Sequence, residues 1–186
     1  MLARRASLFA AVVLTAALAG PVAAQAAEPC AGADVVPTQA TVALVHSATL
    51  CLLNRERAAR GLPALLSQPT LRSIATRYAD MMVSQRFFDH VSPGGSTLGS
   101  RIASSGYTRS SISWSAGENI GWGSGVAATA ASMVDAWMAS PPHRANILDR
   151  RFREIGIGVA SGAPAQLSPG EQAATYATEF GRRVRG

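Results

Sequence analysis

The sequence predicts an α+β domain in which helices cover an antiparallel sheet. Apolar residues recur at helical spacing in the first half of the chain, and they alternate with polar residues in stretches of the second half. Glycine and proline separate these segments from one another. The predicted order is three helices, a strand, a helix and two strands, which suits an α+β domain without internal repeats.

The first 26 residues have the pattern of a secretory signal peptide. Arg4 and Arg5 precede an apolar run from Ala6 to Gly20, and Ala24-Gln-Ala26 offers a cleavage site. The apolar run is shorter than the about 20 residues that a membrane span needs. We therefore expect a secreted chain without a membrane span, long enough to form one domain with its own core.

The first predicted helix runs from about Thr41 to Arg60 and ends at Gly61, a residue suited to the position after a helix. Its polar and charged residues 54–57 are expected to face the solvent. A second helix is predicted behind Ser67, with Pro69 in its first turn, where a missing N–H costs little. The spacing of the apolar residues in both segments fits a helix better than a strand.

The later elements follow from the same signals. Gly117-Glu-Asn119 is expected to interrupt the first strand, and Gly121–Gly125 is expected to form a loop, because it lacks the full spacing of a phosphate cradle. The residues from Gly181 onward are expected to form a tail. These elements are predicted at residues 97–105 (helix), 111–122 (strand), 126–139 (helix), 154–159 (strand) and 173–180 (strand).

Ser140-Pro-Pro-His143 ends one helix and begins another. Ser140 precedes a proline, which disfavours the α conformation and makes it a natural N-cap. Pro141 and Pro142 lack N–H groups that a first helical turn leaves unpaired. His143 would lie in that turn, where the helix dipole disfavours the imidazolium. A neutral imidazole at a fixed point suits a metal or a polarised ligand, although a packing or capping role explains the pattern equally well.

The two cysteines, Cys30 and Cys51, both lie in the exported part of the chain. An even number of cysteines in an oxidising compartment favours one disulfide, which would tie the N-terminal segment to the first helix. Their spacing matches neither a redox motif nor a cysteine zinc site.

The formal net charge is +6, and it falls to +4 when Arg4 and Arg5 leave with the signal peptide. Arginines cluster at residues 150–153 and 182–185. Such clusters can contact an anionic wall polymer or a lipid headgroup, or they can be solvated surface and a frayed tail. Export argues against a role with nucleic acid.

Three residues form the candidate site. His90 and His143 each stand at a helix boundary beside a breaker, and Glu118 would bring a carboxylate from a strand, whereas His46 reads as an ordinary packed or surface histidine. Two imidazoles and a carboxylate can hold a zinc ion with water in the fourth position. Neither a His-Glu-x-x-His nor a Gly-x-Ser-x-Gly motif, the usual signs of a hydrolase, occurs in the sequence.

Several stretches resemble, in order, the signature of the CAP superfamily, the SCP/PR-1-like domain shared by cysteine-rich secretory proteins, antigen 5 and pathogenesis-related 1 proteins. The resemblance covers roughly residues 44 to 181 and is specific because the motifs occur together and in order. The motifs are Asn54–Pro63, Phe87-Phe-Asp-His90, Ala116-Gly-Glu-Asn-Ile120, Trp137–Leu148, Phe152–Gly158 and Tyr176–Gly181.

The resemblance implies a three-layer α-β-α sandwich with a central cavity lined by two histidines and two acids. Carried over, the histidines are His90 and His143, the first acid is Glu118, and Ser140 stands where the second acid of eukaryotic members lies. The acid set is therefore incomplete. The chain would divide into a signal peptide (1–26), an N-terminal segment (27–43), the CAP domain (44–181) and a tail (182–186).

Three functions fit these residues. The first is a secreted, non-catalytic module whose cavity binds a divalent metal such as zinc and small or lipid-like ligands, with an extracellular or cell-wall partner. The second is a metal-dependent hydrolase, acting on wall peptides, with Glu118 as general base. The third treats His90, Glu118 and His143 as a hydrogen-bond network that joins helices to the sheet without any ligand.

Overall fold

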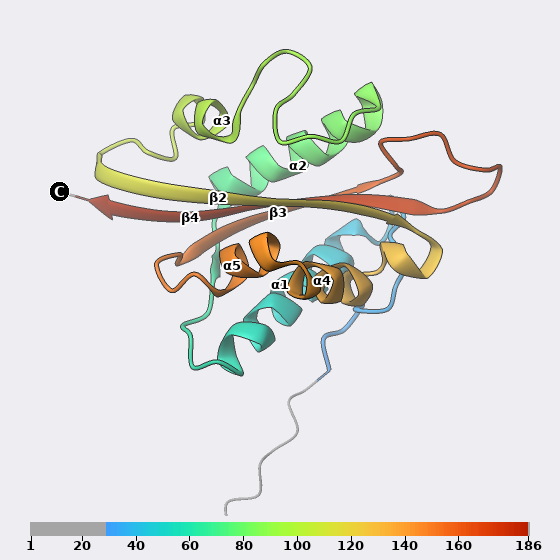
Figure 1. Ribbon diagram of the computed structural model, residues 1–186, viewed down its shortest axis with the longest axis horizontal. Coiled ribbons are helices and arrows are strands. Elements are labelled where there is room, and N and C mark those ends of the chain that lie inside the picture. The colour runs from blue at the N-terminus through green and yellow to red at the C-terminus, as the bar shows by residue number, and fades with distance from the viewer. Residues whose placement is uncertain (1–28, 186) are drawn as a thin grey trace, which may run out of the picture.

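The computed structural model describes residues 29–185, so the predicted signal peptide lies outside the described residues. The described part folds into helices on both faces of one sheet (Figure 1). The helices are α1 (Val42–Ala58), α2 (Pro69–Gln85), α3 (Leu98–Ser104), the 3-10 helix η1 (Gly125–Ala128), α4 (Ala130–Ala139) and α5 (Pro141–Leu148). The strands are β1 (Leu66–Ser67), β2 (Ser111–Ser124), β3 (Glu154–Ser161) and β4 (Ala173–Arg185).

The sheet has the order β1-β3-β4-β2. The central strand β4 runs antiparallel to both β2 and β3, while the two residues of β1 run parallel to β3. Helices α2 and α3 lie on one face, and α1, α4 and α5 lie on the other (Figure 1). The predicted α+β fold and its three layers are confirmed, with a sheet that is mixed because of β1.

Apolar side chains fill the space on both faces of the sheet. The larger cluster lies between the sheet and the layer of α1 and α4, and it includes Leu53, Trp137, Tyr176 and Phe180. On the other face, α2 packs so closely on β3 that a Cβ at Gly158 would collide with the backbone at Ala75. Such contact requires glycine on the strand.

Two predictions about the strands are wrong. Strand β2 continues through Gly117-Glu-Asn119 without interruption, and β4 runs to Arg185, so residues 182–185 form a strand end and no tail. The reason is the pairing of the two strands: Ser115 faces Arg182 and Ser111 faces Arg185 in the register. Backbone hydrogen bonds to a neighbouring strand thus extend β4 through its arginine-rich end, where the side-chain pattern gives little signal.

The segment predicted as one helix at 126–139 is two elements. The backbone of Thr129 is extended, with φ −70° and ψ 155°, and separates η1 from α4. Its side chain accepts a hydrogen bond from the N–H of Ser132, which makes Thr129 the N-cap of α4. Likewise, much of the predicted loop 121–125 belongs to the end of β2.

Arg57 also differs from its prediction, because it is fully buried and does not face the solvent. Its guanidinium donates hydrogen bonds to four backbone carbonyls, including those of Ile147 (2.7 Å), Asp149 (3.0 Å) and Phe152 (3.2 Å). Residues 147–149 end α5 and leave carbonyls without helical partners. Arg57 therefore fixes the end of α5 to α1.

The predicted disulfide is confirmed: Cys30 and Cys51 are bonded, with their Cα atoms 5.8 Å apart. The bond attaches the segment before α1 to the middle of that helix. Within residues 29–185, no helix is long and apolar enough to cross a membrane.

Candidate functional site

Strand β2 lies at one edge of the sheet, and its alternation directs Glu118 and Asn119 to opposite faces. Asn119 faces α5, where its amide donates to the carbonyl of His143 (3.0 Å). Asn146 of α5 in turn donates to the Glu118 carbonyl (3.0 Å) and to the Asn119 side chain (2.8 Å). A Cβ at Gly117 would lie 2.9 Å from Asn146 Oδ1, so glycine there admits α5. The Gly-Glu-Asn motif thus docks one helix and presents a carboxylate on the other face.

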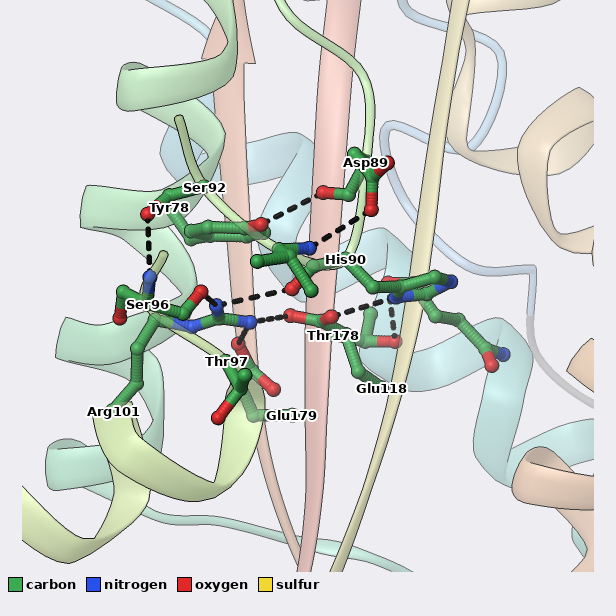
Figure 2. Close-up of polar contacts among 12 residues, drawn as sticks. Tyr78, Asp89, His90, Ser92, Ser96, Thr97, Arg101, Glu118, Thr178 and Glu179 are labelled. Carbon is green, nitrogen blue, oxygen red and sulfur yellow. Dashed lines mark hydrogen bonds and ion pairs between the residues drawn. The ribbon is translucent and has the colours of Figure 1, made fainter. Parts of the chain in front are cut away.

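The carboxylate of Glu118 is buried and fully engaged. One oxygen lies 2.7 Å from Nδ1 of His90, which follows α2, and the other forms an ion pair with Arg101 of α3 (Figure 2). Only 3% of the Glu118 side chain is exposed. Glu118 therefore joins the β2 edge to both helical segments on its face.

Arg101 is held in place on several sides. Its guanidinium lies over the ring of Tyr78, 3.5 Å from the ring centre, and donates to the carbonyls of His90 (3.3 Å) and Ser96 (3.0 Å). A capping box at the start of α3, in which Thr97 and Ser100 exchange hydrogen bonds, fixes the helix that carries it. The cation thus has hydrogen bonds, an aromatic face and a carboxylate around it.

A second acid, Glu179, lies opposite Glu118 on β4. It is fully buried, and neither of its carboxylate oxygens has a hydrogen-bond partner among the residues that the structure describes. The nearest cation is Arg101, whose Nη2 lies 4.0 Å from Glu179 Oε1 (Figure 2). Burial, and next the charge of Glu118, raise the pKa of Glu179 well above its ordinary value. The site therefore favours the protonated form of Glu179.

His143 lies on the opposite side of β2, in the first turn of α5. Its Nδ1 lies 2.7 Å from Oγ of Ser140, and burial, and next the charge of His90, lower its pKa. Ser140 occupies the N-cap of α5 as predicted, but its hydroxyl bonds the imidazole and no backbone N–H. The reason is that the His143 ring stands within reach of the same hydroxyl. In both histidines Nδ1 is engaged, which leaves Nε2 for a ligand.

A pocket of about 330 Å³ opens beside His143 at the outer edge of β2. Trp137 closes its inner side, and its indole N–H donates to the carbonyl of Ile120 (3.2 Å). Gly121 allows α4 to approach, because a Cβ there would collide with Met133. The lining is mostly apolar and consists of Phe88, Ile120, Gly121, Trp122, Ala127, Ser132, Met133, Ala136, Trp137, Ser140 and His143.

A second hollow of about 350 Å³ lies between α1 and α2 at the edge of β3. Arg72 and His46 line it, and Nε2 of His46 is buried without a hydrogen-bond partner within the described part of the chain. Burial and the neighbouring Arg72 lower the pKa of His46. The pocket beside His143 differs from this hollow in that Phe88, Trp122 and Trp137 line it.

The sequence-predicted residues are thus partly brought together. His90 and Glu118 are in contact, His143 and Ser140 form a separate pair, and the pKa of His143 responds to the charge of His90. Over residues 29–185, no three His, Cys, Asp or Glu side chains are grouped as a metal would require. Because Arg101 and His90 occupy the Glu118 carboxylate, Glu118 does not fit as a direct ligand in this arrangement. The described hydrogen bonds of His90 and His143 use Nδ1 and not Nε2, and Glu118 orients the His90 ring through its Nδ1.

Sequence reasoning missed Arg101 and Glu179. Glu179 is an acid among apolar and small residues of β4. A predicted pairing of this strand with β2 could have placed Glu179 opposite Glu118. Arg101 gave no such signal, because an arginine in a short amphipathic helix is ordinary surface chemistry.

The model of the cysteine-rich secretory protein family, CAP, matches residues 50–175. The chain belongs to the CAP family. All of the residues of the His90–Glu118–Arg101 network and the His143–Ser140 pair lie inside the matched range, while Glu179 lies just beyond it.

This CAP protein also resembles individual bacterial proteins. It is 37% identical over 113 residues to the uncharacterized protein YkwD of Bacillus subtilis, in an alignment covering 60% of this chain and 41% of that protein. The chain thus spans less than half the length of that relative.

Solved structures share the fold at low sequence identity. An extracellular protein of Bacillus anthracis containing an SCP domain superposes with a TM-score of 0.58 at 22% identity, covering 81% of this chain and 44% of that one. An outer surface protein of Borrelia burgdorferi gives 0.54 at 21% identity, covering 79% and 96%. At these identities the likeness establishes the CAP fold alone.

Proposed function

We propose that this CAP protein is a secreted, non-catalytic binding module whose pocket at the outer edge of β2 takes a small, largely apolar ligand. The observation that carries the proposal is the pocket itself, with Trp122, Met133 and Trp137 in its lining and His143 at its margin. Ligand sites in proteins combine such apolar walls with a few fixed polar groups. Its volume of about 330 Å³ suits a short lipid-like chain.

Secretion is supported by two observations. The Cys30–Cys51 disulfide is the kind of bond that persists in oxidising compartments. The structural relatives in Bacillus anthracis and Borrelia burgdorferi are described as extracellular and outer surface proteins. An extracellular or cell-wall ligand fits this location.

We propose further that a divalent metal, zinc for example, binds to the Nε2 atoms of His90 and His143. The lowered pKa of His143 favours the neutral imidazole that a metal needs. Glu118 would act through its hydrogen bond to His90 Nδ1, which fixes the orientation of the ring.

A hydrolase is supported less well. A general base must take up a proton from water or substrate, but both oxygens of Glu118 already accept contacts from His90 and Arg101. The network interpretation describes His90 and Glu118 correctly, whereas His143 bonds Ser140 instead. A structural network and a binding pocket therefore lie on the two sides of the same strand.

The ligand proposal is tested by titrating the chain from residue 27 with 1-octanol. We expect a Kd on the order of 0.1–1 mM, because a short apolar chain can gain only a few kcal/mol from such a pocket. Ala136→Phe, which places a ring in the pocket, should weaken binding at least tenfold. Ala139→Phe lies on the same helix outside the lining and serves as the matched control. Equal binding by both variants would remove the pocket as the site.

The metal proposal is tested separately by zinc titration calorimetry. His90→Ala and His143→Ala should each abolish the site, and Glu118→Gln should weaken it about 10–100-fold, as removal of an orienting partner does. His46→Ala is the control, since His46 lines the other hollow. Zinc affinities that are equal in the wild type and in both histidine variants would show that zinc binds elsewhere.

A further inference from the structure

The fold brings together the two arginine clusters that lie far apart in the sequence. Figure 1 shows the end of β4, the start of β2 and the loop between α5 and β3 at the same end of the sheet. Arg151 and Arg182 line one hollow of about 150 Å³ there, next to Trp114. Arg153, Arg182 and Arg185 line a second hollow of about 420 Å³. We call this region the basic end.

Most of the positive charge at the basic end is unpaired. Arg151 forms an ion pair with Asp149 (2.6 Å), and Arg183 forms one with Glu154 (2.7 Å). The other arginines there are exposed and form no ion pair with the acids that the structure describes. These are Arg109, Arg150, Arg153, Arg182 and Arg185. Within residues 29–185, Glu154 is the acid that lines the larger hollow, and the exposed arginines outnumber it, so the basic end carries a net positive charge.

Large apolar side chains are exposed in the same region. Ile112 is 74% exposed and Trp114 is 42% exposed, and both lie in the part of β2 that pairs with residues 183–185. Leu66, 67% exposed, lines the larger hollow with Arg153 and Arg185. Large apolar side chains gathered on one surface among charged residues are typical of a site that binds another surface.

We propose that the basic end is a docking surface for an anionic lipid bilayer, separate from the pocket beside His143. Arginine guanidinium groups bind phosphate with paired hydrogen bonds, and each cation near an anionic membrane adds to the attraction. Trp114 and Ile112 would insert into the interface between headgroups and acyl chains, a region in which tryptophan is enriched. A water-soluble polyanion would use the arginines but leave the apolar side chains in water, so the bilayer fits both observations.

The test measures binding of the chain from residue 27 to phosphatidylcholine vesicles with and without phosphatidylglycerol, by sedimentation. Replacing Arg150, Arg182 and Arg185 with glutamine should weaken binding to the anionic vesicles about 100-fold, at about fivefold per arginine. Arg55→Gln, Arg77→Gln and Arg86→Asn form the matched control, because they remove the same charge from exposed positions on α1, on α2 and just after α2. That control should change binding by less than about threefold.

Ile112→Ser combined with Trp114→Ser separates a bilayer from a soluble polyanion. We expect this variant to lose about tenfold in vesicle binding and to bind sodium polyphosphate as the wild type does. Circular dichroism and melting curves of each variant check that the sheet is intact. The proposal is overturned if the wild type does not bind anionic vesicles, or if the triple control variant loses as much vesicle affinity as the triple variant of the basic end. It is also overturned if the variant with Ile112→Ser and Trp114→Ser keeps full vesicle affinity.

Discussion

Replacing Arg101 with methionine tests the structural account of the site in its most buried part. The change keeps much of the side-chain length but removes the only cation near Glu118 and Glu179 in the described structure. Both carboxylates are buried, and 9% of the Arg101 side chain is exposed. The hydrogen bonds to the carbonyls of His90 and Ser96 and the contact with Tyr78 would be lost as well.

The expected loss is large because one charge of a buried pair remains uncompensated. Removing one partner of such a pair costs about 3–5 kcal/mol, against about 1 kcal/mol or less for an exposed pair. For a domain of this size, the melting temperature should fall by about 10 °C. Arg77→Met, which removes an exposed arginine on α2, is the control and should have little effect.

The assay is urea unfolding followed by circular dichroism with the disulfide intact. The measurement is repeated in a Glu118→Gln background, where the carboxylate that needs the cation is gone. If the two residues interact as the structure shows, the cost of Arg101→Met should be smaller there by about 2 kcal/mol. A loss below about 1 kcal/mol in the wild-type background, or an equal loss in both backgrounds, would refute the reasoning.

Three further predictions follow from individual side chains. Glu179→Gln should stabilise the protein by about 1–3 kcal/mol near pH 8 and by less near pH 5. The raised pKa means that the folded state holds a proton that is released as the pH rises, and a urea series across pH measures this. His143 has a lowered pKa, so stability should fall as the pH drops below about 6.5, and His143→Gln should flatten that fall. Arg57→Met should cost at least about 3 kcal/mol in the same assay, because it leaves four carbonyls without their donor, two of them in buried hydrogen bonds, whereas Arg60→Met on the surface should cost less than about 1 kcal/mol.

Local signals predicted much of the fold correctly. Pro141 and Pro142 marked the start of α5, Gly61 placed the end of α1 within two residues of Ala58, and the oxidising context of Cys30 and Cys51 gave the disulfide. In each case the information lies in a few neighbouring residues, or in chemistry that does not depend on the fold.

The errors arose where distant segments determine the outcome. The end of β4 is a strand because β2 lies beside it, and Arg57 is buried because the end of α5 reaches α1. Helical periodicity alone places a charged residue at the surface, since it carries no information about carbonyls that approach from another element.

The same distinction applies to the site. The histidine and glutamate residues were identified by position and by family resemblance, but their partners were not. Glu118 faces Glu179 and meets Arg101 only because the strand register and α3 place them there. Ser140 lies at a helix start as expected, yet its hydroxyl contacts the His143 ring instead of a backbone N–H. The choice between these two partners depends on where the side chains lie, which the sequence does not specify.

The most direct test of the central claim, that the pocket beside His143 is a ligand site, is methyl NMR during titration with 1-octanol. We expect the largest shifts at Met133, Ala127 and Ala136, which line that pocket. Val42 and Val159, which line the hollow between α1 and α2, should shift little. Shifts confined to Val42 and Val159, or the absence of saturable shifts at Met133, would contradict it.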